Sequence, residues 1–182
     1  ASASGNTVAY VAAAQQDILV PSSSTYYNLY LTGGNTKTVK ADLTISGEVY
    51  ITSTLSVDDG GNNWSLAIGG DWHNDGMFDE ASGLVTFNGT TDQDIIGTAT
   101  DQFYNLNINK SGGNVLLEKN ITVSNILTMT AGDIQNNGNR IVLGTSTANT
   151  GTLTYFSGTI IGQFERWISD ASGGVFFPVG LE

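Results

Sequence analysis

The sequence predicts an all-β protein, a right-handed parallel β-helix (β-solenoid) of about eight or nine coils. Three observations predict it: a long internal repeat, short strands of alternating polarity, and a composition typical of strands joined by tight turns. The 182 residues are 40% hydrophobic and 13% charged, with 23 glycines. Disordered chains carry more charge and fewer aliphatic residues. Because β-branched residues favour strands, while Gly, Asn and Asp favour turns, this composition indicates a folded β-protein.

The internal repeat has a period of about 77 residues, and such a period is a signature of repeat architectures. Val8-Ala9-Tyr10, for example, is matched by Val85-Thr86-Phe87. The two copies cover residues 6–83 and 84–158 and are followed by a C-terminal remnant over residues 159–182. Each copy divides into stretches of roughly 19 residues, a plausible length for one solenoid coil. We therefore expect two repeats of about four coils each, followed by the remnant.

Alternation of apolar and polar residues predicts which side chains point into the coil. The expected inward residues are Leu29, Leu31, Leu43, Ile45, Leu66, Ile68, Leu106, Ile108, Ile121, Val123, Ile141 and Leu143. The alternative architecture is a pair of tandem β-sandwiches of about 77 residues each. A sandwich pair needs a linker, and no Pro- or Ser-rich break occurs near Gly83. The sequence therefore favours a single solenoid domain over residues 1–182.

The charge balance excludes several classes of partner. The formal net charge is −11, with only six Lys plus Arg. Without a basic stripe to neutralise phosphates, neither nucleic acid nor an anionic membrane surface is an expected partner. No apolar run has the length of a transmembrane helix, so membrane insertion is not expected. The terminal Leu181-Glu182 resembles what a common cloning junction leaves, which indicates a fragment of a longer protein.

Several segments resemble a known family. Val85-Thr86-Phe87-Asn88-Gly89, the stretch from Phe103 to Gly113, and the stretch from Gly70 to Phe78 resemble repeats of surface-exposed right-handed parallel β-helix proteins of Bacteroidetes. The resemblance implies export, often by the type IX route, and a place outside the cell or on its surface. It further implies adhesion or scaffolding, and it brings no catalytic motif.

We therefore interpret the chain as a structural or adhesive repeat module and not as an enzyme. Its expected partners are surface glycans, or surface proteins of a host or a neighbouring cell. The alternative is a carbohydrate-binding or polysaccharide-degrading β-helix module. A Ser-His-Asp catalytic triad would have to use His73, the single histidine. The sequence contains no Gly-x-Ser-x-Gly elbow to supply the serine, so such a triad is not expected. Arg140 and Arg166 are the basic residues that a lyase would use, and neither lies in an acidic cluster of the sequence.

An acidic turn gives the one cofactor hypothesis, which is calcium. Asp71, Asp75 and Asp79 are spaced around Gly76 in a way that is similar to an EF-hand loop. The match is incomplete, because His73 occupies a ligand position and the bidentate Glu is missing. The alternative is a solvated polar turn, and the same choice applies to residues 58–63.

Aromatic residues give the ligand-binding hypotheses. Tyr27 and Tyr104 occupy matching positions in the two copies, so stacked and outward rings would form a sugar-binding ladder. The alternative is core stacking with one surface aromatic residue in each repeat. Trp64 and Trp72 have no aromatic counterpart in the second copy, which favours a specific contact for each.

Two further expectations concern the surface and the C-terminal end. Outward threonines would suit an ice-binding face, but their register is irregular along the sequence. The aromatic-rich segment from Trp167 to Pro178 departs from the coil pattern. Because Pro178 cannot donate to a strand ladder, we expect this segment to close the last coil.

Overall fold

The computed structural model describes residues 5–169 and 173–180, so Leu181 and Glu182 lie outside it. These ranges form 22 β-strands, β1 to β22, and contain no helix. Within them there is accordingly no helical segment that could cross a membrane.

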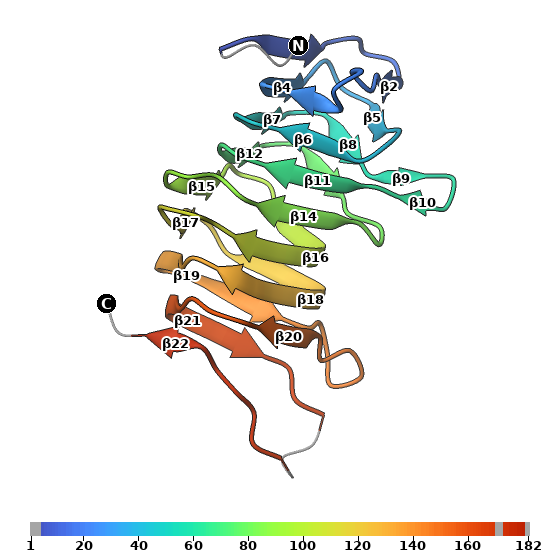
Figure 1. Ribbon diagram of the computed structural model, residues 1–182. Helices are drawn as coiled ribbons and strands as arrows, with labels where there is room; N and C mark the ends of the chain where they lie inside the picture. The colour runs from blue at the N-terminus through green and yellow to red at the C-terminus, as the bar shows by residue number, and fades with distance from the viewer. Residues whose placement is uncertain (1–4, 170–172, 181–182) are drawn as a thin grey trace.

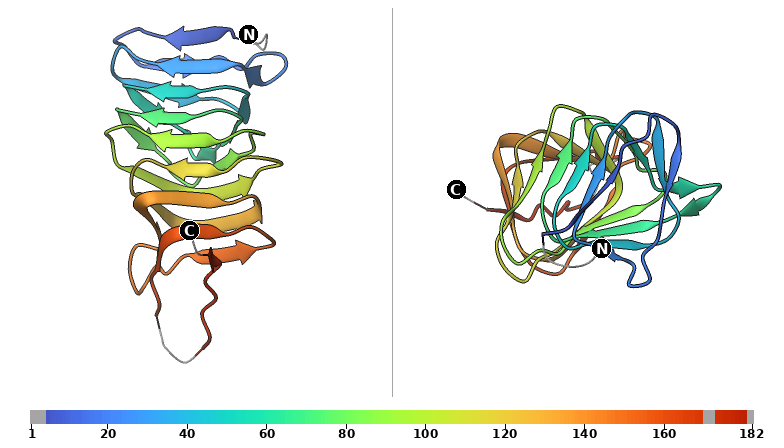
Figure 2. Two further views of the ribbon diagram at one scale, coloured as in Figure 1. Left: turned by 90° about the vertical axis from the view of Figure 1, so that its left-hand side faces the viewer. Right: turned by 90° about the horizontal axis from the view of Figure 1, so that it is seen from above.

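The chain winds into a parallel β-solenoid of about eight turns, as predicted (Figure 1). Figure 2 shows that the strands nearest the viewer point left while the chain descends from the N-terminus to the C-terminus. This direction defines a right-handed coil, the usual hand for parallel crossovers. All pairings between coils are parallel and join strands of successive turns.

Each turn passes over three faces of a prism. Face 1 consists of β3 (Thr25–Tyr26), β6 (Leu43–Ile45), β11 (Ser65–Ile68), β14 (Leu84–Phe87), the later parts of β16 (Asp101–Asn109) and β18 (Ile121–Ala131), and β20 (Thr152–Tyr155). Face 2 consists of β1 (Thr7–Tyr10), β4 (Asn28–Leu31), β7 (Val49–Ile51), β12 (Trp72–Asn74), β15 (Gln93–Ile96), β17 (Val115–Leu117), the first parts of β19 (Ile134–Leu143) and β21 (Ile160–Arg166), and β22 (Val179–Gly180). Face 3 consists of β2 (Gln16–Ile18), β5 (Thr36–Val39), β8 (Thr54–Ser56), β13 (Met77–Asp79), the first parts of β16 and β18, and the later parts of β19 and β21.

The two similar stretches of sequence do not superpose coil on coil. Val8 lies in β1 on face 2, whereas its counterpart Val85 lies in β14 on face 1. The second copy is therefore rotated by one face relative to the first, and the expected division into whole coils is corrected. The physical reason is that all three faces offer an alternating strand the same environment, with one side in the core and the other in solvent.

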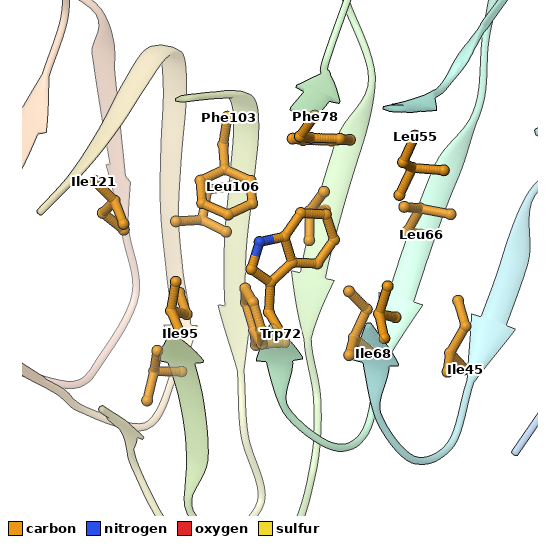
Figure 3. Close-up of a cluster of buried hydrophobic side chains, with 14 of the residues drawn as sticks. Ile45, Leu55, Leu66, Ile68, Trp72, Phe78, Ile95, Phe103, Leu106 and Ile121 are labelled. Carbon is orange, nitrogen blue, oxygen red and sulfur yellow. The ribbon is translucent and has the colours of Figure 1, made fainter. Parts of the chain in front are cut away.

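The core is a continuous stack of inward side chains, and all the residues expected to point inward are buried. It contains an aromatic cluster around Trp72 (Figure 3). The ring of Trp72 lies 4.9 Å from that of Phe78 and 5.5 Å from that of Phe103, in edge-on or tilted arrangements that aromatic pairs prefer.

A hairpin of β9 (Asp58–Asp59) and β10 (Asn62–Asn63) projects between β8 and β11. Its turn uses Gly60 and Gly61, both with positive φ. Since glycine adopts this geometry freely, the Asp- and Asn-rich stretch folds as a turn. An ion pair of 2.7 Å between Lys40 and Asp59 ties the hairpin to the end of β5.

At the C-terminal end, the chain leaves the coil after β21 and returns as β22, which pairs with β21 on face 2. Pro178 takes part as an acceptor, because its carbonyl oxygen receives the Ile160 N–H at 2.7 Å. The Phe177 ring lies 5.7 Å from that of Phe164, the last residue of an inward column on face 3. Phe177 and Pro178, at the end of the aromatic-rich segment, thus contact the last coil, and residues 170–172 of that segment lie outside the described residues.

Candidate functional site

Side chains at the corners join each coil to the next. The Asp71 carboxylate accepts a hydrogen bond of 2.9 Å from the backbone N–H of Asp94, 23 residues further along the chain. Six further backbone N–H groups donate in the same way to a side-chain oxygen of the preceding coil. The pairs, donor first, are Ser65 and Asp42, Ser82 and Asn63, Thr98 and Asp75, Asn114 and Asp92, Arg140 and Asn120, and Thr159 and Asp133. Many acidic residues therefore have a structural role, which local sequence reasoning missed.

The three carboxylates of the calcium hypothesis are not brought together. Asp71 precedes β12, Asp75 follows it, and Asp79 ends β13, so they lie at separate positions around the coil. Asp79 accepts a hydrogen bond of 2.7 Å from the Ser56 hydroxyl. Hydrogen bonds from Thr98 lower the pKa of Asp75. Within the described ranges, no three Asp, Glu, His or Cys side chains are arranged to hold a metal ion.

Trp72 belongs to the core and presents no surface to a ligand. Its side chain is fully buried, and its indole N–H donates to the buried carboxylate of Asp101 at 3.1 Å. Asn74 donates to the same carboxylate at 2.6 Å, and the Lys119 ammonium lies 2.6 Å from it. This buried polar cluster joins three coils, and its charges are paired as burial requires.

Tyr27, Tyr104 and Trp64, the other residues that were expected to contact a ligand, are not brought together. Tyr27 lies between β3 and β4, at the corner of faces 1 and 2, whereas Tyr104 lies at the bend of β16, between faces 3 and 1. They therefore form no common ladder, a consequence of the one-face rotation between the copies. Trp64 is partly buried against the core beside the hairpin.

A different aromatic column lies on face 2, formed by Tyr30, Tyr50 and His73. The rings of Tyr30 and Tyr50 are 5.3 Å apart, and those of Tyr50 and His73 are 4.6 Å apart. The rings meet edge to face, and the Tyr30 hydroxyl donates to Glu48 at 2.7 Å. Only the coil register brings these residues together, since no sequence motif marks them.

Face 1 carries two outward columns without a charged side chain. One column consists of Thr25, Thr44, Ala67, Thr86, Asn107, Thr128 and Thr154, and the other consists of Ser65, Leu84, Asn105, Ile126 and Thr152. Neighbouring positions are spaced at about 4.8 Å between coils and about 6.7 Å along a strand. Threonine occupies five of the seven positions in the first column and one of the five in the second, so the threonine rows are interrupted on this face.

Face 3 is hollowed in its C-terminal half. A cavity of about 670 Å³ is lined by Arg140, Arg166, Trp167 and Phe177 among others, and one of about 360 Å³ adjoins it. The two cavities share Thr122, Arg140 and Val142, so they form one groove, called the face-3 groove below. The residues come from successive coils, which explains why their sequence positions gave no signal.

The described residues thus present three surface features: an uncharged face 1, an aromatic column on face 2, and a groove on face 3 that contains two arginines. All three lie on a rod with an aliphatic and aromatic core. Comparison with protein-family models, with curated proteins and with solved structures gave no match to this chain.

Proposed function

We propose that the chain is a non-catalytic structural and adhesive module of an extracellular or cell-surface protein, and that face 1 holds glycan chains. The observation that carries this proposal is the uncharged pair of columns on face 1. In a chain of net charge −11, these columns carry hydroxyl, amide and aliphatic groups only. Such groups suit sugar hydroxyls and do not repel an acidic partner.

The rigidity of the stack supports adhesion to a repetitive ligand. Outward side chains on face 1 are held at fixed spacing by parallel ladders, so little freedom is lost when they bind. Each hydroxyl or amide contact is weak, but contacts along several coils act together on a polymer. Proteins on a host or neighbouring cell are the other class of partner.

The finer assignment, to the type IX-secreted surface repeat proteins of Bacteroidetes, is part of the same proposal. The β-helix fold supports it together with the resembling segments around Val85 and Phe103. It would make the chain one section of a longer rod that carries adhesive surfaces away from the cell.

Sedimentation with insoluble neutral polysaccharides tests the proposal. We expect retention of the protein, and we expect the double variant Thr86→Glu/Thr128→Glu to lose it, since two carboxylates would interrupt the uncharged column. Thr54→Glu on face 3 adds a carboxylate away from face 1 and is the matched control. Equal retention of the double variant, or no retention of the parent chain, would reject face 1 as a glycan surface.

The polysaccharide-degrading alternative has one observation in its favour, the face-3 groove with Arg140 and Arg166. A lyase would release unsaturated oligosaccharides, which absorb ultraviolet light. The non-catalytic proposal predicts no such release from acidic polysaccharides over long incubation.

A further inference from the structure

The buried polar cluster around Asp101 places an amine, a carboxylate and a carboxamide in direct contact. Asp101 Oδ2 lies 2.6 Å from the Lys119 Nζ atom, and Asp101 Oδ1 accepts a hydrogen bond of 2.6 Å from the side-chain Nδ2 of Asn74. One carboxylate therefore bridges the amine and the amide. Lys119 Nζ also donates to the backbone carbonyl oxygen of Asn74 at 3.3 Å, so the amine lies beside the residue that carries the amide.

These three groups are shielded from water. Asn74 and Asp101 are fully buried, and 11% of the Lys119 side chain is exposed. The aromatic cluster of Figure 3 adjoins them, since the indole N–H of Trp72 donates to Asp101 and the Trp72 ring packs against that of Phe103. Exclusion of water allows an amine to react with a carboxamide without competition from hydrolysis.

The carboxamide of Asn74 is oriented at both ends. Its Oδ1 accepts a hydrogen bond of 3.0 Å from the Gly76 backbone N–H. When a nucleophile adds to the carboxamide carbon, negative charge develops on this oxygen, and a fixed N–H donor stabilises it. The nitrogen at the other end, Nδ2, faces the Asp101 carboxylate. The leaving nitrogen therefore lies beside a group that can exchange protons with it.

We propose that Lys119 and Asn74 form an intramolecular amide bond, with Asp101 as the catalytic base and acid. Asp101 takes a proton from the ammonium group of Lys119, which lies within the hydrogen-bond reach that a general base needs. The neutral Nζ attacks Cγ of Asn74, the Cγ–Nδ2 bond breaks, and ammonia leaves. Of the three hydrogens on the ammonium group, one stays on the new amide, one leaves with the ammonia, and one remains on Asp101.

The new bond joins parts of the chain that lie 45 positions apart in the sequence. On face 2, β12 pairs with β15 and β15 pairs with β17, and Lys119 follows β17. The cross-link therefore spans two successive interfaces between coils. Such a link stabilises a fold mainly by restricting the unfolded chain, as a disulfide does across a long loop. The inference does not depend on the proposed binding of glycans by face 1.

The chain contains an internal control, which is Lys110. This buried lysine also contacts a carboxamide, since its ammonium donates to Gln93 Oε1 at 2.7 Å. Its other acceptors are the backbone carbonyl oxygens of Gly89 and Thr91, so none of the three is a carboxylate. Without a carboxylate to move the protons, Lys110 and Gln93 should remain separate.

Mass spectrometry of the intact, denatured protein tests the inference. We expect the parent chain to be lighter than its sequence mass by one ammonia, and a tryptic digest to contain a pair of peptides joined through Asn74 and Lys119. Lys119→Arg and Asp101→Ala should have their full sequence masses, because the first lacks the amine and the second lacks the base. Lys110→Arg is the matched control and should keep the loss of one ammonia.

Several outcomes would overturn the proposal. A parent chain of full sequence mass would reject the cross-link, and loss of water in place of ammonia would assign the bond to Lys119 and Asp101. A link at Lys110, or loss of ammonia in a folded Asp101→Ala variant, would show that the carboxylate is not needed. The mass of the parent chain is decisive even if Asp101→Ala fails to fold. Sedimentation with neutral polysaccharides reports on face 1 alone, so the two proposals can fail separately.

Discussion

At the residue scale, buried polar side chains hold the corners of the stack together. Lys110 is 3% exposed, and its ammonium donates to Gly89 O at 3.2 Å, Thr91 O at 2.9 Å and Gln93 Oε1 at 2.7 Å. These acceptors belong to the preceding coil. One lysine thus provides hydrogen bonds to three acceptors inside the protein, of which Gln93 Oε1 also accepts the Gly89 N–H at 2.7 Å.

Lys110→Met should lower the free energy of unfolding by about 2–4 kcal/mol, because it leaves buried acceptors without a donor. Chemical denaturation of the variant and the parent chain measures this. Lys40→Met, at an exposed ion pair, is the control and should change stability little. Equal stability of Lys110→Met and the parent chain would contradict the structural role.

The same lysine should make stability depend on pH. Burial lowers the pKa of Lys110 from 10.5 to about 8. Between these values the unfolded chain binds more protons than the folded one, so stability rises with pH in this window. The difference in unfolding free energy between the parent chain and Lys110→Met should therefore increase from pH 8 upward. A difference that stayed constant would show that the lysine titrates normally.

Asp94 gives a second dependence of stability on pH, with the opposite sign to that of Lys110. Burial, followed by the charges of Asp71, Glu118 and Asp92, raises its pKa above 3.8. The folded chain then binds more protons than the unfolded one just above pH 3.8, and stability falls as the pH rises through this region. Asp94→Asn should melt at a higher temperature than the parent chain at pH 7, and the gain should disappear below pH 3.8. Asp17→Asn, beside Lys40 instead of other carboxylates, should show no such gain.

The separate positions of Asp71, Asp75 and Asp79 lead to a prediction about metal removal. Since each carboxylate already accepts a hydrogen bond from another coil, calcium has no preformed cage there. Melting temperatures in excess calcium and in excess chelator should therefore be equal. A rise with calcium that Asp75→Asn abolished would restore the EF-hand-like interpretation.

At the element scale, the sharp corners between strands need glycine where the next coil approaches. Gly33 and Gly34 both have positive φ. A Cβ atom on Gly33 would lie 1.9 Å from the Val11 carbonyl oxygen, whereas one on Gly34 would meet nothing within 4 Å. Gly33→Ala should therefore cost several times more stability than Gly34→Ala, for which we expect about 1–2 kcal/mol from backbone strain alone. Thermal melting of the two variants compares them, and equal losses would mean that the corner can move.

The element scale also shows what the sequence could predict. Strand alternation is a local property, so the inward residues, from Leu29 to Leu143, were identified correctly. The face of each strand depends on the length of every earlier turn, and residues paired between successive coils lie from 18 to 26 positions apart in the sequence. Trp72 was expected to contact a ligand because it lacks an aromatic counterpart in the second copy, but its side chain is in the core. The face-3 groove escaped prediction because lining residues such as Thr122, Val142 and Glu165 become neighbours only through the pairing of successive coils.

At the scale of the whole molecule, stability comes from contacts between neighbouring coils, so the two ends are its weakest parts. At the N-terminal end, Val11 and Leu19 are exposed, while the Ala12 and Ala14 carbonyl oxygens are bound by Lys37. At the C-terminal end, β21, β22 and the aromatic segment cover β19. Ile134 and Ile141 of β19 are fully buried there.

Deleting the residues after Ser157 should lower the melting temperature and promote association. The deletion removes the partners of β19 and leaves its backbone N–H and C=O groups unpaired beside Ile134 and Ile141. An open, apolar strand edge is a template for pairing with a second molecule. Phe177→Ala is the milder companion variant: it keeps β21 and β22 and removes one ring from Phe164, so its melting temperature should fall between those of the parent and truncated chains. Calorimetry and light scattering measure both effects. A truncated chain that melted at the parental temperature and stayed equally soluble would show that the last coil needs no cover.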